Sequence, residues 1–102
     1  MNATLNRLAL PAKLGGYAVR RAGESELDAI ARSIARRLGG GAFLHHRIQD
    51  GGLANREGKI TALRWRLMFV NPGSAANGCP VSYECSVTTY DLAPPSEELA
   101  PA

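Results

Sequence analysis

The stretch LHHRIQDGGLANREGKITALRWRL, residues 44–67, decides the fold of this chain because it carries two strand patterns around a glycine-rich connection. Residues 42–50 (AFLHHRIQD) and 59–70 (KITALRWRLMFV) are rich in β-branched, aromatic and aliphatic residues, which favour strands. Asp50-Gly51-Gly52 opens the connection with strong turn signals. We therefore expect an antiparallel hairpin whose loop spans residues 51–58.

Folding the chain about the middle of this loop fixes the register of the expected hairpin. Apolar side chains then meet on one face and polar ones on the other, as a sheet with one buried face requires. Because adjacent residues of a strand point to opposite sides, His45 and His46 make a poor metal site. The expected neighbours are Leu44 with Trp65 and His46 with Leu63 on the apolar face, and His45 with Arg64 and Phe43 with Arg66 on the other.

An amphipathic helix is expected upstream of the hairpin, over residues 26–38. Ser25 followed by Asp28 is typical of a capping box at its start, and Gly39 supplies the left-handed residue that ends helices. Apolar residues recur at intervals of three and four, which places them on one narrow face that can cover one side of a sheet. These residues are Leu27, Ile30, Ala31, Ile34 and Leu38.

Two further strands complete the expected fold. Residues 17–21 form a short first strand, and residues 81–92 (VSYECSVTTYDL) form the last one, after the turn signals of Asn71-Pro72-Gly73. The order strand, helix, strand, strand, strand predicts an α+β domain with a single antiparallel sheet of three or four strands and one helix packed on one face. In the last hairpin, the expected pairs are Trp65 with Cys85 and Arg66 with Glu84.

Residues 1–92 are expected to form one domain, in which residues 1–14 are a loosely structured arm. Residues 93–102 read as a disordered tail that is acidic and rich in proline. A chain of 102 residues is long enough for a single buried core. Its apolar runs are far shorter than the roughly 18 residues that span a bilayer, and its N-terminus lacks a signal-peptide pattern, so we expect no membrane association and a cytoplasmic protein.

Charge is distributed unevenly along the chain, although the net charge is only +3. Residues 1–66 hold all 12 lysines and arginines with five acids, whereas residues 67–102 hold four acids and no base. Ten of the 12 bases are arginine, whose planar guanidinium binds carboxylate or phosphate with two parallel hydrogen bonds. This asymmetry indicates either a surface for an acidic partner or a basic domain with a solubilising tail.

The candidate binding site is the sheet face that the helix leaves open. It is expected to be rich in arginine, with Glu84 as its only nearby acid, so that either water solvates the charges or a partner covers them. Phe43 among these charges could stack on a base or anchor a protein. The expected binding residues are Arg20, Phe43, His45, Arg47, Arg64 and Arg66.

No catalytic, metal or cofactor motif accompanies this face. The glycine run after the helix lies on the wrong side of it for a phosphate loop, and the two cysteines match no zinc spacing. His46 is expected to face the core. Cys79 in a loop could be an exposed thiol. A small enzyme or ligand-binding protein built around His46, Tyr83 and Cys85 stays open as a third alternative, although it would need an enclosed pocket.

The sequence thus favours a small non-catalytic protein-binding module, an accessory or inhibitor-like factor that uses the arginine-rich face. The alternative is a nucleic-acid-binding module that uses the same face together with Arg36 and Arg37. The expected partners are an acidic protein surface or a nucleic acid, with no small-molecule substrate and no cofactor evident. A free strand edge also makes a homodimer possible.

Overall fold

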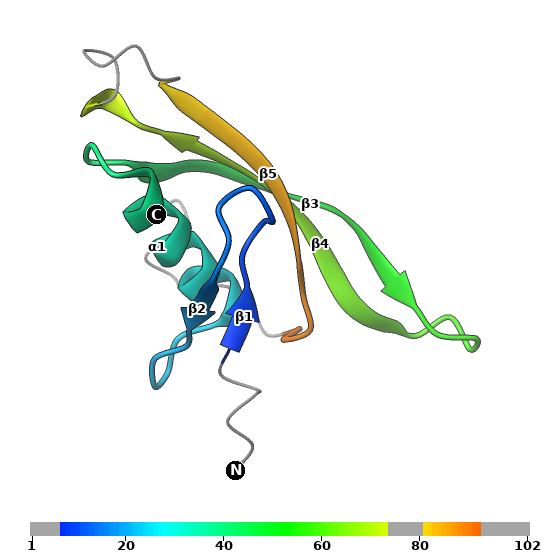
Figure 1. Cartoon of the computed structure of the whole chain (residues 1–102). Helices are drawn as coiled ribbons and strands as arrows, with labels where there is room; N and C mark the ends of the chain where they lie inside the picture. The colour runs from blue at the N-terminus through cyan, green and yellow to red at the C-terminus, as the bar shows by residue number, and fades with distance from the viewer. Residues whose placement is uncertain (1–6, 74–80, 93–102) are drawn as a thin grey trace.

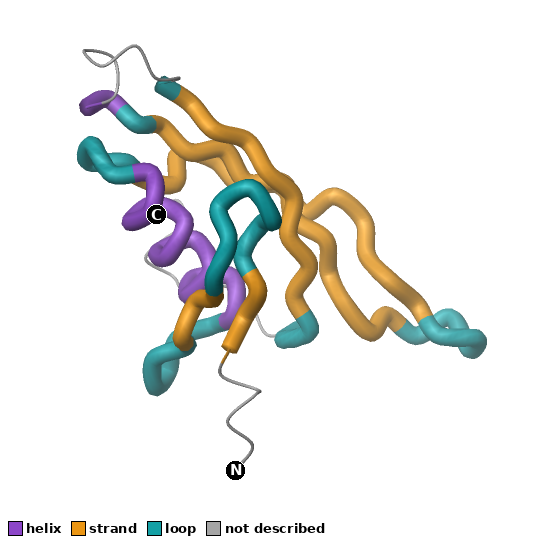
Figure 2. Tube along the Cα trace, viewed as in Figure 1, coloured by secondary structure: helices purple, strands orange, loops and turns teal. Residues whose placement is uncertain are grey.

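The computed structural model describes residues 7–73 and 81–92 of the chain. These residues form one helix and two antiparallel sheets, one of two strands (β1-β2) and one of three (β3-β4-β5) (Figures 1 and 2). The expected α+β class with one helix is confirmed, whereas the expected single sheet is in fact two. The elements are β1 Arg7–Ala9, β2 Tyr17–Val19, α1 Glu26–Leu38, β3 Phe43–Ala54, β4 Ile60–Val70 and β5 Ser82–Thr89.

The first expected strand does not join the main sheet. It is β2, which pairs with β1 in a short hairpin, so that Leu8 lies opposite Ala18. Leu10 after β1 is buried, and Leu8 and Leu14 pack against the core. Residues 7–14 are therefore part of the packed domain and not a loose arm, because their leucines supply apolar surface to the core. Residues 1–6 and the expected tail, 93–102, lie outside the described residues.

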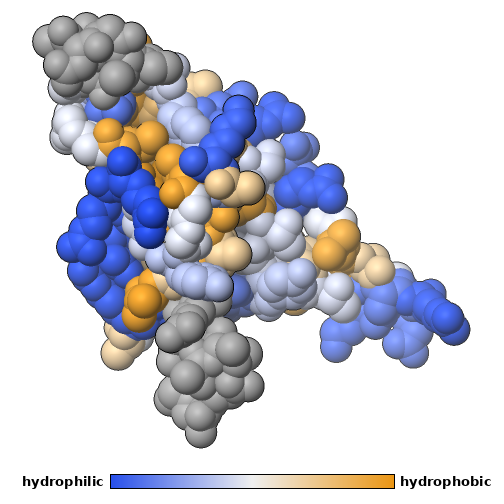
Figure 3. Space-filling view, viewed as in Figure 1, coloured by the Kyte–Doolittle hydropathy of each residue, from blue (hydrophilic) through white to orange (hydrophobic). Residues whose placement is uncertain are grey.

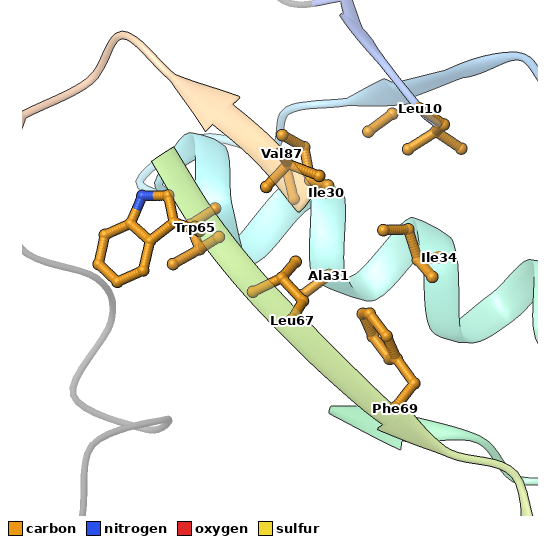
Figure 4. Packing of buried hydrophobic residues seen from close by; sticks show 11 residues of the cluster. Leu10, Ile30, Ala31, Ile34, Trp65, Leu67, Phe69 and Val87 are labelled. Atoms are coloured by element: carbon orange, nitrogen blue, oxygen red, sulfur yellow. The ribbon is translucent and has the colours of Figure 1, made fainter. Parts of the chain in front are cut away.

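The helix begins and ends where the sequence predicts. The Ser25 side chain accepts a hydrogen bond of 3.1 Å from the backbone N–H of Asp28, and Gly39 ends the helix with φ of 67°. Its apolar stripe packs on the three-stranded sheet, where Ala31 lies near Leu67 and Ile34 near Phe69 (Figure 4). Three further helix residues outside this stripe are buried as well: Glu26, Ala29 and Ser33. The helix is therefore buried over a wider face than the single apolar stripe of the sequence predicts.

The core face of β4 and β5 is the one that the sequence predicts. Leu67 and Phe69 are fully buried. Arg64 and Arg66, which alternate with the buried row of β4, are exposed. On β5 the inward residues are Tyr83, Cys85, Val87 and Thr89. The indole Nε1 of Trp65 donates a hydrogen bond of 3.0 Å to Thr89 Oγ1, which satisfies the polar atom of an otherwise apolar side chain.

The register of the β3–β4 hairpin differs from the expected one. Asp50-Gly51-Gly52 lies inside β3 as an irregularity in the ladder. The chain reverses only after Ala54, in the turn between β3 and β4. The turn is built on Asn55, whose Oδ1 accepts hydrogen bonds from the backbone N–H groups of Glu57 and Lys59, at 2.9 and 3.0 Å. All four expected pairs are wrong as a result: Leu44 lies opposite Phe69, His46 opposite Met68 and Phe43 opposite Val70, and His45 is skipped in the register.

The longer strands also make the hairpin project from the rest of the molecule. The last pair between β4 and β5 is Leu63 with Thr89, so the chain from Gly52 to the turn and back forms a two-stranded ribbon (Figure 1). The tip of this ribbon is hydrophilic (Figure 3). The molecule is accordingly elongated, with extents of 50 × 29 × 28 Å.

The β4–β5 register is shifted by two residues from the expected one. Trp65 lies opposite Val87 and Arg66 opposite Ser86, whereas Glu84 lies opposite Met68. A shift of two residues keeps every side chain on its predicted face, which is why the faces are right although the pairs are wrong. The start of β5 is tied to Asn71, whose N–H donates a 2.6 Å hydrogen bond to Val81 O.

Candidate functional site

A bulge near the start of β3 decides which side chains reach the open side of the sheet. Leu44 is opposite the buried Phe69, whereas His46 is opposite Met68, so His45 is an extra residue between two regular pairs. From His46 to Gln49, each side chain of β3 therefore points to the side opposite the one that unbroken alternation from Leu44 predicts. Arg47 therefore lies on the helix side of the sheet, opposite Leu67.

Two expectations about β3 are corrected by this bulge. His46 was expected in the core but is exposed on the open side, and Arg47 was expected on the open side but is partly buried on the helix side. The Nη1 atom of Arg47 is buried and has no hydrogen-bond acceptor among the described residues. A buried donor without an acceptor is unfavourable, which makes Arg47 the least well satisfied arginine of this region.

Arg20 also lies away from the expected face. It follows β2, outside the three-stranded sheet, and its Nη2 forms an ion pair of 2.7 Å with Asp91 Oδ2. Its Nε donates a 2.6 Å hydrogen bond to the backbone oxygen of Glu24. Arg20 thus joins the end of β2 to the segment after β5. The signal for this pair, one acid 71 residues away in sequence, could not be found without the fold.

We define the open face as the side chains of the three-stranded sheet that alternate with the buried row of β4. Of the expected binding residues, it contains Phe43, Arg64 and Arg66, with His45 exposed at the bulge. Phe43 and Ile48 are about half exposed, at 50% and 46%. The full open face comprises Phe43, His46, Ile48, Arg64, Arg66, Met68, Val70, Ser82, Glu84, Ser86 and Thr88.

The open face is less basic and more apolar than expected. Arg66 Nη2 forms an ion pair of 3.1 Å with Asp50 Oδ2, and both side chains are about half exposed. Arg64 forms no ion pair with any residue that the structure describes. The expected neutralisation of Arg66 by Glu84 is therefore replaced by Asp50, because the bulged β3 brings that carboxylate alongside. The Arg64 guanidinium remains without a carboxylate, on the same face as the apolar side chains Phe43 and Ile48.

The three residues of the alternative enzyme-like site do not come together. His46 lies on the open face, whereas Tyr83 and Cys85 lie on the helix side. Burial, aided by the charge of Glu84, raises the pKa of the Cys85 thiol to about 11, so it is protonated at neutral pH. Cys79 lies outside the described residues. Over residues 7–73 and 81–92, no cluster of three or more His, Cys, Asp or Glu side chains could hold a metal ion.

A groove on the helix side, missed by sequence reasoning, lies between α1 and the beginning of β3. It encloses about 570 Å³. Small side chains of Ala31, Ala35 and Ala42 contribute to its walls. The polar residues of its lining are Arg21, Glu24, Asp28 and Arg32. Two helical alanines, Ala31 and Ala35, are a weak signal in a sequence, because alanine is common in any helix.

A bidentate ion pair closes one end of this groove. Arg32 Nε and Nη2 donate hydrogen bonds to Glu24 Oε2 and Oε1, at 3.0 and 3.1 Å, and Nη2 also bonds Val19 O at 2.7 Å. The hydrogen bond from Arg32 lowers the pKa of Glu24, against the opposing effect of burial, and the same bond raises the pKa of Arg32. This pair fixes the loop before α1 against the helix.

Comparison of the chain with protein-family models, with curated proteins and with solved structures found no match. In the part of the chain that the structure describes, α1 is too short and too polar to cross a membrane.

Proposed function

We propose that this protein is a small non-catalytic binding module whose open face is covered by a partner protein. The observation that carries the proposal is the half-exposed pair Phe43 and Ile48 on the same face as Arg64, which has no ion-pair partner among the described residues. The matching surface would present aliphatic or aromatic side chains around a carboxylate that pairs with Arg64. An accessory or inhibitor-like role fits this description.

The composition of the open face supports a protein partner. Aromatic and arginine side chains contribute most to protein–protein binding energies when they become fully desolvated at the centre of an interface. Phe43 and Arg64 supply both types, and Met68 and Val70 supply further partly exposed apolar surface on the same face. A row of hydroxyl side chains on β5, Ser82, Ser86 and Thr88, gives a flat polar border that is easily desolvated.

The nucleic-acid alternative has less support from the same geometry. Phosphate binding draws its affinity from several cationic contacts, each of which releases counterions. Of the five expected bases, Arg20 and Arg47 point elsewhere, and Arg66 is paired with Asp50. Glu84 adds a negative charge to the same face. Of the five, Arg64 and His45 remain, and together with the exposed His46 they make a weak site for a polyanion.

The test compares capture by three immobilised chains: the wild type, Arg64→Glu and the matched charge reversal Arg56→Glu at the hydrophilic tip of the hairpin. Proteins captured from a lysate of the source cells are quantified after circular dichroism has confirmed that each variant folds. We expect a specific partner to be lost at least tenfold from Arg64→Glu and retained by Arg56→Glu, because a charge reversal in an interface centre costs about 1.4 kcal/mol or more. Equal capture by both variants would refute the assignment of the face.

A second measurement separates the two partner classes. Fluorescence anisotropy with short single-stranded and duplex DNA and RNA is recorded over a salt titration. A protein-binding face predicts weak binding with no loss in Arg64→Glu. Tight binding that weakens steeply with salt, and that Arg64→Glu abolishes, would show that nucleic acid is the partner instead.

A further inference from the structure

The outer edge of β3 borders the groove and is free over its first half. β3 is the end strand of the order β3-β4-β5, so alternate backbone N–H and C=O groups point away from the sheet. Within the described part of the chain, no hydrogen bond joins the backbone of residues 43–49 to any segment other than β4. An unpaired edge of this kind is a template for an added strand.

The groove lies where such a strand would run. Phe43 and Leu44 of β3 and the preceding Ala42 line it on one side, and Ala31 and Ala35 line it from α1. The loop of residues 21–24 forms its far wall. Since Ala31 and Ala35 present only methyl groups between the longer Asp28 and Arg32, side chains of an added strand could reach the helix at these two positions. A volume of about 570 Å³ is within the usual range of roughly 300–1,000 Å³ for ligand sites.

Two guanidinium groups near the groove are free to bind a carboxylate. Arg21 lines it and forms no ion pair with a described residue, although its charge helps to lower the pKa of Glu24. Arg47 lies on the same side of β3 as Leu44, and its buried Nη1 has no acceptor among the described residues. By contrast, Arg32 is saturated by Glu24 and Val19. The lining holds two acids, Glu24 and Asp28, and two bases, Arg21 and Arg32, so that Arg47 beside it makes the charge around the groove net positive.

We propose that this groove binds an extended acidic peptide segment of a partner protein. The segment adds to the outer edge of β3 through backbone hydrogen bonds, places aliphatic side chains on the alanine wall of α1, and pairs a carboxylate with Arg21 or Arg47. The groove lies on the helix side of the sheet and shares Phe43 with the open face, whereas Arg64 belongs to the open face alone and Ala35 to the groove alone. Arg64→Glu and Ala35→Leu therefore test the two sites separately, and failure of one leaves the other intact.

The probe is a fluorescent hexapeptide, Val-Ser-Glu-Ser-Val-Ser, whose valine and glutamate side chains share one face of an extended strand. Its binding to the full chain is measured by anisotropy. Two control peptides replace glutamate by lysine, or methylate alternate backbone nitrogens so that they cannot donate. Binding at least tenfold tighter for the acidic peptide than for both controls is expected. Equal binding of all three peptides, or no binding of the acidic one at millimolar concentration, would overturn the proposal.

Variants locate the site. Ala35→Leu fills the groove without removing a core side chain, and Arg36→Leu places the same side chain on the exposed helix surface one residue on. We expect at least a tenfold loss for Ala35→Leu and less than a twofold change for Arg36→Leu. Arg21→Glu gives a second, independent variant and should weaken the acidic peptide severalfold. An unchanged affinity in both Ala35→Leu and Arg21→Glu would exclude the groove.

Two other possible occupants of the groove are distinguished by the peptide assay and by sedimentation. If the chain's own acidic segment filled the groove, the double variant Glu97→Gln/Glu98→Gln would bind the probe at least tenfold more tightly than the wild type. If a second copy filled it, sedimentation would show a dimer that Ala35→Leu converts to a monomer. Either result would overturn the assignment to a separate partner. A monomer whose two glutamine substitutions leave the probe affinity unchanged supports it.

Discussion

The carboxylate of Glu26 accepts a hydrogen bond of 2.7 Å from the backbone N–H of Tyr90, and the N–H of Asp91 donates to the same oxygen. Glu26 lies in the first turn of α1 and is buried, whereas Tyr90 and Asp91 directly follow β5. A single acid thus joins the start of the helix to the end of the sheet. Because the helix N-terminus also favours negative charge, this position suits a buried carboxylate.

Replacement of Glu26 should therefore destabilise the fold more than replacement of an exposed glutamate. We expect Glu26→Ala to lower the free energy of unfolding by about 1–3 kcal/mol, because two backbone N–H groups lose their acceptor. Glu26→Gln, which keeps an acceptor oxygen, should cost less. Urea unfolding followed by circular dichroism measures both, and Glu57→Ala at the hairpin turn is the control. Equal stability of Glu26→Ala and that control would contradict this role.

The Glu24–Arg32 pair should make stability fall on acidification. The pKa of Glu24 is lowered in the folded chain, chiefly by the hydrogen bond from Arg32. Its stabilising effect is therefore fully present above the unfolded pKa, near 4.5, and is lost as the pH falls through the lower folded value. The difference in unfolding free energy between wild type and Glu24→Gln should shrink between pH 6 and pH 3. A difference that is constant over this range would exclude the linkage.

Cys85 should be unreactive while the protein is folded. With its pKa raised to about 11, only about one thiol in ten thousand is ionised at pH 7, and the thiolate is the reactive form. In a Cys79→Ser background, a thiol-specific reagent should label the native chain slowly and the chain in 6 M guanidinium chloride quickly. Rapid native labelling at pH 7 would show that Cys85 is not held as described, and would reopen a nucleophilic role.

The irregularity in β3 at Asp50-Gly51-Gly52 should not tolerate a side chain at its second glycine. A Cβ atom on Gly52 would lie 2.5 Å from the backbone oxygen of Ala62, so one strand would have to move. We expect Gly52→Ala to cost about 1–3 kcal/mol of stability through this clash. Gly51→Ala is the comparison, since its φ of 87° is strained for alanine but its Cβ meets nothing. Thermal or urea unfolding of the two variants checks this, and an unaffected Gly52→Ala would argue against the register.

Sequence reasoning succeeded where the period of the side chains is unbroken. From the pair Leu63–Thr89 to the pair Val70–Ser82, the ladder between β4 and β5 contains no extra residue. The buried row and the exposed arginines therefore follow directly from the alternation of side chains. The helix was equally readable, because Ser25 and Gly39 mark its ends and its apolar spacing marks its inner face.

The same reasoning failed at β3, for a physical reason. Glycine pairs favour turns and bulges alike, and only the pairing partner decides which one forms. Reading Asp50-Gly51-Gly52 as a turn shortened the hairpin, and the bulge at His45 inverted the sides of His46 and Arg47. Two of the five expected bases left the face: Arg47 through the bulge, and Arg20 because β2, which it follows, belongs to a separate sheet.

Arg20 and the groove depend on contacts far apart in sequence. Arg20 is paired with Asp91, and the groove joins the loop of residues 21–24 to the start of β3. Strands of three residues, such as β1 and β2, carry too few positions for a periodic pattern. Neither feature has a local signature.

The most direct test of the proposed function follows the methyl groups of the open face by NMR when the captured partner is added. The chain is labelled at its Met, Ile and Val methyl groups, with Val19 on β2 as an exposed reference on another element. Our account predicts that the methyl signals of Ile48, Met68 and Val70 shift or broaden while those of Val19 stay in place. Unchanged signals from these three residues in a saturated complex would show that the partner binds elsewhere.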